Sequence, residues 1–314
     1  MSLTRKDVVS AYRTFLGRRP ESEEAIAAHM RARSLDVLHR IFLESPEFRQ
    51  RVQALQTGRV PLDMPPIEVD VEVDEEALKA LLGHVRRCWE FMGRERPHHS
   101  VLTDPNFLPD ALSDNEAEFW DSGERDAEVL EKILARHGIG SLNSLSCIDF
   151  GCGVGRVTAP LAARFSTVNA YDISAPHIEI AKGRAGDANF HLLRELPVLF
   201  LPTDVFYSRI VLQHNPPPII ALLIKSALDC LKPGGIAVFQ VPTYETAYNF
   251  VIAKYLKKLA KSPLNMEMHC LPQHHVFRLA REAGCEVLEI REEDSTGRAG
   301  SDISNLFVIR RKTT

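Results

Sequence analysis

The stretch C-I-D-F-G-C-G-V-G-R at residues 147–156 decides the fold of this 314-residue chain. Its first four residues form an apolar run typical of a buried strand, and the residues after the glycines predict a helix through Phe165. Glycines in such a turn allow strained dihedral angles and a close approach of a ligand, and a helix N-terminus offers free amide donors. A tight turn in any doubly wound fold would look similar, so the loop alone is weak evidence.

Strands and helices alternate from residue 146 to the end of the chain, which predicts an α/β protein with a doubly wound, mostly parallel sheet. The last two expected strands have no helix between them, so we expect an antiparallel edge. The expected strands are 147–150, 168–171, 189–193, 205–211, 236–241, 286–291 and 306–310.

The chain before residue 144 divides by composition. Residues 1–57 predict a small all-α bundle, and residues 58–76 predict a linker, with three prolines and an acidic run. Residues 77–314 then form the main domain, with its core at 144–314. Within it, residues 96–123 have little periodicity and three prolines, which predicts a long loop that covers a site.

Composition narrows the class of protein. The formal net charge is −4 with both signs mixed, which argues against a nucleic-acid-binding protein. Six cysteines without a C-x-x-C pair suit a reducing compartment. No apolar stretch resembles a signal peptide or a membrane span, so we expect a cytoplasmic protein without an integral membrane segment. The oligomeric state is not predicted.

Asp172 follows the second expected strand, about 20 residues after the glycine loop. This is the distance at which a carboxylate accepts both ribose hydroxyls of a bound nucleotide. The alternative is a turn residue ahead of the helix that begins near Ser174.

Four elements in order resemble the class I (Rossmann-like) S-adenosylmethionine-dependent methyltransferases. The third glycine of the loop comes one residue earlier than in the dinucleotide motif, and the residues after each expected strand match as well. The four are D-F-G-C-G-V-G-R at 149–156, Y-D-I-S at 171–174, V-F-Y-S-R-I-V-L-Q-H at 205–214 and L-K-P-G-G at 231–235. The resemblance implies an enzyme, a seven-stranded sheet with an antiparallel last strand, and S-adenosyl-L-methionine as cofactor.

The resemblance also implies a set of cofactor-binding residues. The glycines would line the cofactor, Asp172 would hold the ribose and Ile173 would pack on the adenine. Arg156 would either meet the cofactor carboxylate or point to solvent, and Trp120 would either cover the methionine part or belong to the core. The adenine contact after the third strand stays open between Leu193 and Glu195. The full expected set is Asp149, Gly151, Gly153, Gly155, Arg156, Asp172, Ile173, Ser208 and Trp120.

Methyl transfer from a sulfonium is an in-line displacement that depends mostly on orientation and desolvation. An oxygen acceptor usually needs a base, and histidine is the commonest choice. His214 follows the fourth strand at the carboxyl edge of the sheet, and His269 lies before the sixth strand, so both are candidate catalytic residues. Each has a purely structural alternative. The spacing of the histidines predicts no metal site.

A second resemblance covers residues 8–51. Y-R-T-F-L-G-R-R-P at 12–20 and S-P-E-F-R at 45–49 are similar to a small helical domain of unknown function often joined to bacterial glycosyltransferases. It suggests O-methylation of a sugar hydroxyl in a bacterial polysaccharide or glycolipid, and a docking partner for the bundle. The alternatives are a small-molecule or N-methyltransferase, and a non-catalytic module that binds cofactor or glycan.

Overall fold

A computed structural model describes residues 3–57, 59–259, 262–293 and 300–313. These residues form two compact units. The smaller unit comprises the described residues within Met1–Ile67, Tyr244–Asn249 and Gly297–Ile303, and the larger one holds Glu68–Thr243, Phe250–Thr296 and Ser304–Thr314.

The smaller unit contains a helical bundle with its own core. Leu38 and Phe42 are its most buried large side chains, and Tyr12 packs edge-on against Phe42 at a centroid distance of 4.9 Å. Its elements are α1 (Arg5–Ala11), the π-helix η1 (Tyr12–Leu16), α2 (Glu23–His29), α3 (Leu35–Glu44) and α4 (Pro46–Thr57).

Helix boundaries in the bundle follow from capping residues. Thr4 caps α1, and Gly17 ends η1 with a φ of 70°. Ser22, whose side chain accepts from the amide of Ala25, is the N-cap of α2, so Pro20 lies outside the helix.

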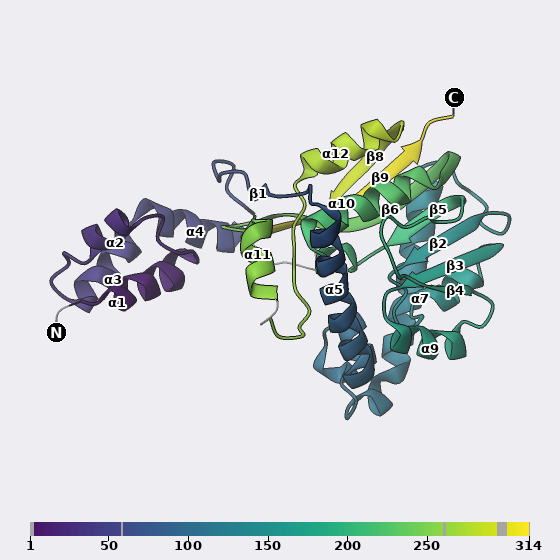
Figure 1. The fold of residues 1–314 in the computed structure, drawn as a ribbon, viewed down its shortest axis with the longest axis horizontal. Coiled ribbons are helices and arrows are strands. Elements are labelled where there is room, and N and C mark those ends of the chain that lie inside the picture. Colours follow the sequence, from purple (N-terminus) through teal and green to yellow (C-terminus); the bar gives the residue numbers. More distant parts are fainter. Residues whose placement is uncertain (1–2, 58, 260–261, 294–299, 314) are drawn as a thin grey trace. The chain divides into compact units, whose positions relative to one another are not determined.

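The larger unit is built on a seven-stranded sheet with the order β4-β3-β2-β5-β6-β9-β8 (Figure 1). The β2 strand pairs in parallel with β3 on one side and with β5 on the other. The next strand pairs outward, β3 with β4 and β5 with β6, are also parallel. The β8 and β9 strands are antiparallel. The predicted doubly wound sheet with an antiparallel edge is therefore confirmed.

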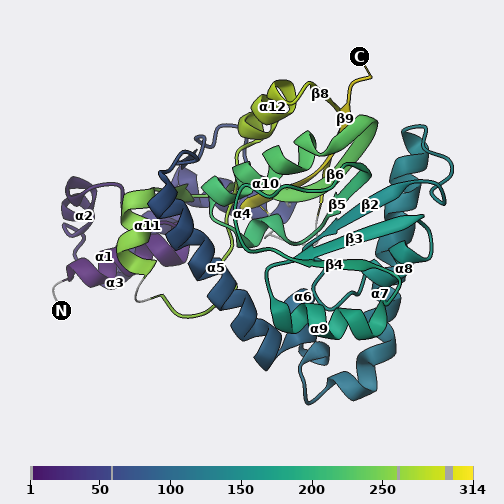
Figure 2. The same ribbon diagram turned by 45° about the vertical axis from the view of Figure 1, so that its right-hand side comes forward.

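The sheet is covered on both faces, because neighbouring residues along each central strand belong to different cores. On β5, for example, Phe206 packs with the core that α10 and α12 complete, whereas Val205 and Tyr207 pack with the core of α7 and α8. Figure 2 shows these helix pairs on opposite sides of the sheet. Helix α5 also contributes Leu81, Leu82 and Val85 to the first core.

The helices and strands of the larger unit have the following bounds. They are β1 (Glu68–Val69), α5 (Glu75–Glu95), α6 (Pro97–Val101), the 3-10 turn η2 (Pro105–Phe107), α7 (Leu112–Arg136), β2 (Ser146–Phe150), α8 (Thr158–Ala162), β3 (Thr167–Asp172), α9 (Ala175–Arg184), β4 (Asn189–Leu192), β5 (Thr203–Ser208), the 3-10 turn η3 (Leu212–His214), α10 (Pro217–Asp229), β6 (Leu231–Glu245), α11 (Ile252–Leu259), α12 (Gln273–Glu282), β8 (Cys285–Glu292) and β9 (Asp302–Arg311). The two-residue strand β7 (Asn249–Phe250) pairs with β1.

Two sequence-based expectations differ from the structure. Residues 96–123 are not one long loop, because α6 and η2 occupy its first part and α7 already begins at Leu112. The buried Phe119 anchors that early half of α7 against Phe107. The helix after the glycine loop is only five residues long and starts at Thr158, since the turn extends through Val157.

Gly155 lies at the point where the glycine loop crosses α9. Its φ is +84°, and an added Cβ would lie 3.1 Å from the Cα and Cβ of Ala181. Gly155→Ala should therefore destabilise the larger unit by more than the about 1–2 kcal/mol that a left-handed alanine costs. Gly138→Ala is the matched control, because Gly138 has a φ of +86° and open space around it. Urea unfolding measures both, and equal losses would contradict the close approach to Ala181.

Candidate functional site

The glycine loop lies at the carboxyl end of β2, where ligands bind in parallel sheets. Gly151 and Gly153 have φ values of 76° and 54° and both line an enclosed cavity. A Cβ on Gly151 would lie 2.3 Å from Val211, and one on Gly153 would lie 2.7 Å from Val101. Glycine is therefore required at both positions, for backbone conformation and for space.

Asp172 ends β3 beside this loop and is 8% exposed. One carboxylate oxygen accepts from the amide of Gly153 at 2.9 Å, and the other accepts from the amide of Ser174 at 2.8 Å. A carboxylate has about four lone-pair sites, so each oxygen retains acceptor capacity toward the cavity that Asp172 lines.

Asp149 lies near the carboxyl end of β2, lines the cavity and is almost fully buried. Burial raises the pKa of this carboxyl to about 6, although the hydroxyl of Thr158 donates to it at 2.6 Å and favours the charged form. Asp149 thus connects the end of β2 to the first residue of α8.

Arg156 points into the protein and not to solvent. Its guanidinium donates to Asp126 at 2.6 Å and to the hydroxyl of Ser122 at 3.0 Å, both on α7. Its buried Nε atom has no hydrogen-bond partner among the described residues, and the side chain lines the cavity. A buried donor of this kind is expected to find an acceptor in the functional state.

Helices α5 and α6 cover the cavity. Trp89 of α5 and Val101 of α6 line it, and Ser100 of α6 hydrogen-bonds to the buried His177 of α9 at 2.9 Å. The other nitrogen of His177 contacts the hydroxyl of Ser174 at 2.7 Å. The cavity has a volume of about 90 Å³, and α5 and α6 form one of its walls.

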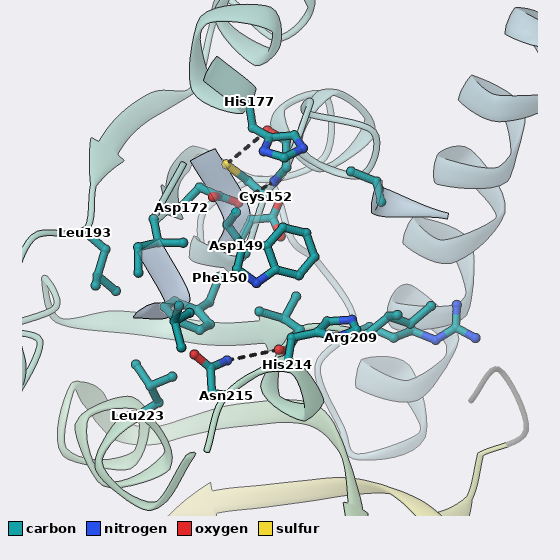
Figure 3. A pocket seen from close by; sticks show the side chains of 18 of the residues that line it. Asp149, Phe150, Cys152, Asp172, His177, Leu193, Arg209, His214, Asn215 and Leu223 are labelled. Atoms are coloured by element: carbon teal, nitrogen blue, oxygen red, sulfur yellow. Dashed lines mark hydrogen bonds between the residues drawn. The ribbon is translucent and has the colours of Figure 1, made fainter. Parts of the chain in front are cut away.

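His214 lies across the cavity from Asp172 and His177 (Figure 3). Its Nδ1 atom is 2.9 Å from the backbone carbonyl of Glu267, and its ring lies edge-on to Trp89 at a centroid distance of 5.1 Å. Burial lowers the pKa of His214 to about 4, so the imidazole is neutral near pH 7.

The cavity brings together most, but not all, of the residues singled out in the sequence. Those lining it are Asp149, Gly151, Gly153, Arg156, Asp172, Ile173 and His214. The two candidates for the adenine contact lie in different places: Leu193 lines the cavity, whereas Glu195 is exposed.

Four predicted site residues lie outside the lining. Trp120 donates to Glu116 and stacks under Arg184, which holds its indole away from the cavity. The hydroxyl of Ser208 donates to the carbonyl of Phe150 at 3.0 Å and so joins two strands. Gly155 packs on α9, as described above.

His269 is the fourth residue of this group and the second candidate base. It is buried, and its Nε2 atom is 3.1 Å from the carboxylate of Glu267. Its ring also packs against Phe250. His269 does not line the cavity, and its amide is bonded to Gln213 of the η3 turn that carries His214.

Sequence reasoning missed Ile210 and His177 as cavity residues. Ile210 has a φ of 59°, which is a rare conformation for a β-branched residue and often marks functional sites. A φ value cannot be read from a sequence. His177 lies three residues into α9, at the edge where the cavity was expected, and that position was the available signal.

Comparison with known proteins decides the family. A family model described as "Methyltransferase domain" matches residues 107–290, which is more than half of the chain. The chain belongs to this methyltransferase family. Its methyl donor is S-adenosylmethionine, the cofactor of the class I methyltransferases that its four motifs resemble.

Similar proteins agree with this assignment. A ubiquinone biosynthesis O-methyltransferase of Nitrosomonas europaea is 25% identical over 56% of this chain and 76% of its own length. One of Rickettsia canadensis is 25% identical over 52% and 71%. The solved structure of magnesium protoporphyrin IX methyltransferase from Synechocystis PCC 6803 shares the fold, with a TM-score of 0.51, 16% identity and coverage of 77% of this chain and 100% of that one.

The described residues contain neither a membrane-spanning helix nor a cluster of metal-binding side chains. No helix in this part of the chain combines the length and apolar character needed to cross a bilayer. No group of three or more histidine, cysteine, aspartate or glutamate side chains there is arranged to hold a metal ion.

Acidification should destabilise this methyltransferase through His214. The unfolded histidine binds a proton with a pKa of about 6.5 and the folded one with a pKa of about 4. The unfolded state therefore binds more protons between these values, and stability falls as the pH falls through this window. Urea unfolding at pH 7 and pH 5 should show a smaller loss for His214→Asn than for the wild type. An identical loss would contradict a neutral His214 in the folded state.

Proposed function

We propose that this methyltransferase transfers the methyl group to a hydroxyl oxygen of its acceptor, with His214 as the general base. The observation that carries the proposal is the 2.9 Å contact between Nδ1 of His214 and the backbone carbonyl of Glu267. Because the Glu267 carbonyl can only accept, Nδ1 carries the hydrogen and Nε2 keeps its lone pair. An imidazole that is neutral at pH 7 and lines the cavity suits removal of a hydroxyl proton.

The cofactor residues follow from the same cavity. Asp172 holds the ribose hydroxyls with its spare lone pairs, and Gly151 and Gly153 let the backbone approach the ligand. Arg156 offers its unpartnered Nε to the cofactor carboxylate, and Ile173 and Leu193 flank the adenine. S-adenosylmethionine supplies an electrophilic methyl group when bound.

The residues of this chain then have three tasks in the reaction. The cover of α5 and α6 excludes water, because Trp89 and Val101 lie over the cavity. The wall between Asp172 and His214 orients the acceptor oxygen for in-line attack. The Nε2 atom of His214 would receive the hydroxyl proton as the acceptor oxygen bonds to the methyl carbon and the methyl–sulfur bond breaks, with the sulfur leaving as a neutral thioether.

Two acceptor classes have specific support. A sugar hydroxyl of a bacterial polysaccharide or glycolipid is supported by the two N-terminal motifs. In the structure these two motifs contact each other, because Arg18 of the first forms an ion pair with Glu47 of the second at 2.6 Å. The two motifs therefore also stabilise the helical bundle. The bundle remains a proposed docking unit for a partner.

A phenolic hydroxyl is supported by the cavity wall. Leu82, Val85 and Trp89 of α5 face the site together with Leu223 of α10, and apolar and aromatic walls favour a flat, apolar acceptor. The similar O-methyltransferases named above also point to oxygen as the acceptor atom.

Asp172→Ala should weaken binding of S-adenosylhomocysteine by about 1–3 kcal/mol, since the variant loses a buried acceptor for the ribose and two bonds that order the loop. Isothermal titration calorimetry measures this loss. Asp187→Ala is the control, because Asp187 is exposed beyond the end of α9. Unchanged affinity in Asp172→Ala would remove Asp172 from the site.

His214→Ala should lower the rate of oxygen methylation by about 10²–10⁴-fold while binding of S-adenosylhomocysteine is retained. The assay supplies methyl-labelled S-adenosylmethionine with catechol, methyl rhamnoside or glycine as acceptor probes, and NMR identifies the methylated atom. Labelled catechol supports the phenolic acceptor and labelled methyl rhamnoside the sugar. Methylation of glycine alone, or full turnover without His214, would overturn the proposal.

A further inference from the structure

A chain of buried hydrogen bonds connects Ile210 to His214 through two glutamine side chains. The amide of Ile210 donates to Oε1 of Gln240 at 2.9 Å. The Nε2 atom of Gln240 donates to Oε1 of Gln213 at 3.0 Å and to the hydroxyl of Ser304 at 2.6 Å. The Nε2 atom of Gln213 lies 3.3 Å from Nε2 of His214. Both glutamines are at most 2% exposed.

The direction of this chain is fixed at both ends by chemistry. The amide of Ile210 can only donate, so Gln240 must present its oxygen there and its NH₂ group to Gln213. Gln213 then accepts with its oxygen and presents its own NH₂ group to His214, whose Nε2 must hold a lone pair. At the other end the carbonyl of Glu267 can only accept, which requires the hydrogen on Nδ1. The two ends agree on one tautomer.

We propose that Gln213 and Gln240 are positioning residues that hold His214 in the tautomer with hydrogen on Nδ1 and the lone pair on Nε2. Neither glutamine lines the cavity, so both act through the histidine and not on the substrate. Nε2 has a single lone pair, so an acceptor hydroxyl must replace the 3.3 Å contact from Gln213, which is long for a hydrogen bond and is therefore readily displaced. This proposal deepens the proposed function of His214, on which its catalytic meaning rests.

The segment that supplies the Glu267 carbonyl is held in place by independent contacts. The amide of His269 donates to the backbone carbonyl of Gln213 at 2.7 Å, so the η3 turn and residues 267–269 are joined in both directions. The carboxylate of Glu267 accepts from the hydroxyl of Tyr255 at 2.5 Å. Burial alone would raise the pKa of Glu267, but its bonds with His269 and Tyr255 lower it to about 2.

The same glutamine chain stabilises the strained turn at Ile210. A φ of 59° is strained for a non-glycine residue and persists only where its surroundings enforce it. The bond from its amide to Gln240 is one such restraint. Gln240 lies on the central strand β6, so a rigid part of the sheet sets the orientation of both Ile210 and His214.

The test is to read the tautomer directly by NMR of protein labelled with ¹⁵N-histidine, in the presence of S-adenosylhomocysteine. His214→Asn identifies the His214 signals. In the wild type at pH 7 we expect hydrogen on Nδ1. In Gln213→Glu a carboxylate oxygen replaces the NH₂ group, so we expect the signals to change to hydrogen on Nε2 or to the imidazolium. Gln240→Glu should produce a mixture of tautomers, because the Gln213 amide loses its fixed direction.

Gln273→Glu is the matched control, because Gln273 is a glutamine of α12 that donates to Asn305 at 2.8 Å and does not line the cavity. Its His214 signals should be those of the wild type. Retained binding of S-adenosylhomocysteine shows that each variant is folded. Hydrogen on Nε2 in the wild type, or an unchanged tautomer in Gln213→Glu, would overturn the proposal.

This readout does not depend on the acceptor. If His214→Ala keeps full turnover while the tautomer behaves as expected, the proposed base fails and the positioning network stands. If His214→Ala abolishes turnover and Gln213→Glu leaves the tautomer unchanged, the network fails and the base stands.

Discussion

The carboxylate of Asp172 is the contact on which the arrangement of the site depends. It accepts the amide of Gly153 from the loop after β2 and the amide of Ser174 at the start of α9. The two adjacent parallel strands would otherwise end in separate, flexible turns. Because the carboxylate joins them at a buried position, the glycine loop has one conformation, and the acceptor capacity left on each oxygen points to the cavity.

The parallel sheet then determines which other residues reach the same cavity. The carboxyl ends of β2, β3 and β5 lie next to each other, so Asp149, Asp172 and the segment after Ser208 meet although they are far apart in sequence. The cover comes from outside the sheet. Its interaction with the site is polar as well as apolar, because His177 connects Ser174 beside Asp172 to Ser100 of α6. The cover is therefore joined by hydrogen bonds to Ser174, whose amide donates to the carboxylate of Asp172.

The parts of this structure that sequence predicts are those governed by local rules. Glycine spacing, the interval to Asp172 and the absence of a helix between the last strands each reflect backbone geometry. The early half of α7 could not be predicted, because Phe119 becomes buried only through tertiary contact with Phe107. Trp120 illustrates the converse, since an aromatic residue at a plausible position packs with Arg184 instead of facing the cavity.

His214 and His269 show why a candidate base cannot be chosen from spacing alone. His269 is buried and His214 is half-buried, and both contact Glu267. They differ in the atom contacted: His214 meets the backbone carbonyl, whereas His269 meets the carboxylate. A carbonyl imposes one tautomer without adding charge, and burial can then keep the ring neutral. His269, in contrast, does not line the cavity.

The side-chain amide of Gln240 connects the core of the sheet to the residues at the cavity. Gln240 is fully buried on β6 and its amide is oriented by partners on three segments, Ile210, Gln213 and Ser304. If the Gln240 amide reversed its direction, its NH₂ group would face the Ile210 amide and its oxygen would face the Gln213 oxygen, and unmet buried polar groups cost about 1–3 kcal/mol each. The energetic preference for one direction is therefore several times the thermal energy. The orientation of one side chain in the core of the sheet thus restrains the strained backbone at Ile210 and, through Gln213, acts together with the Glu267 carbonyl on the ring of His214.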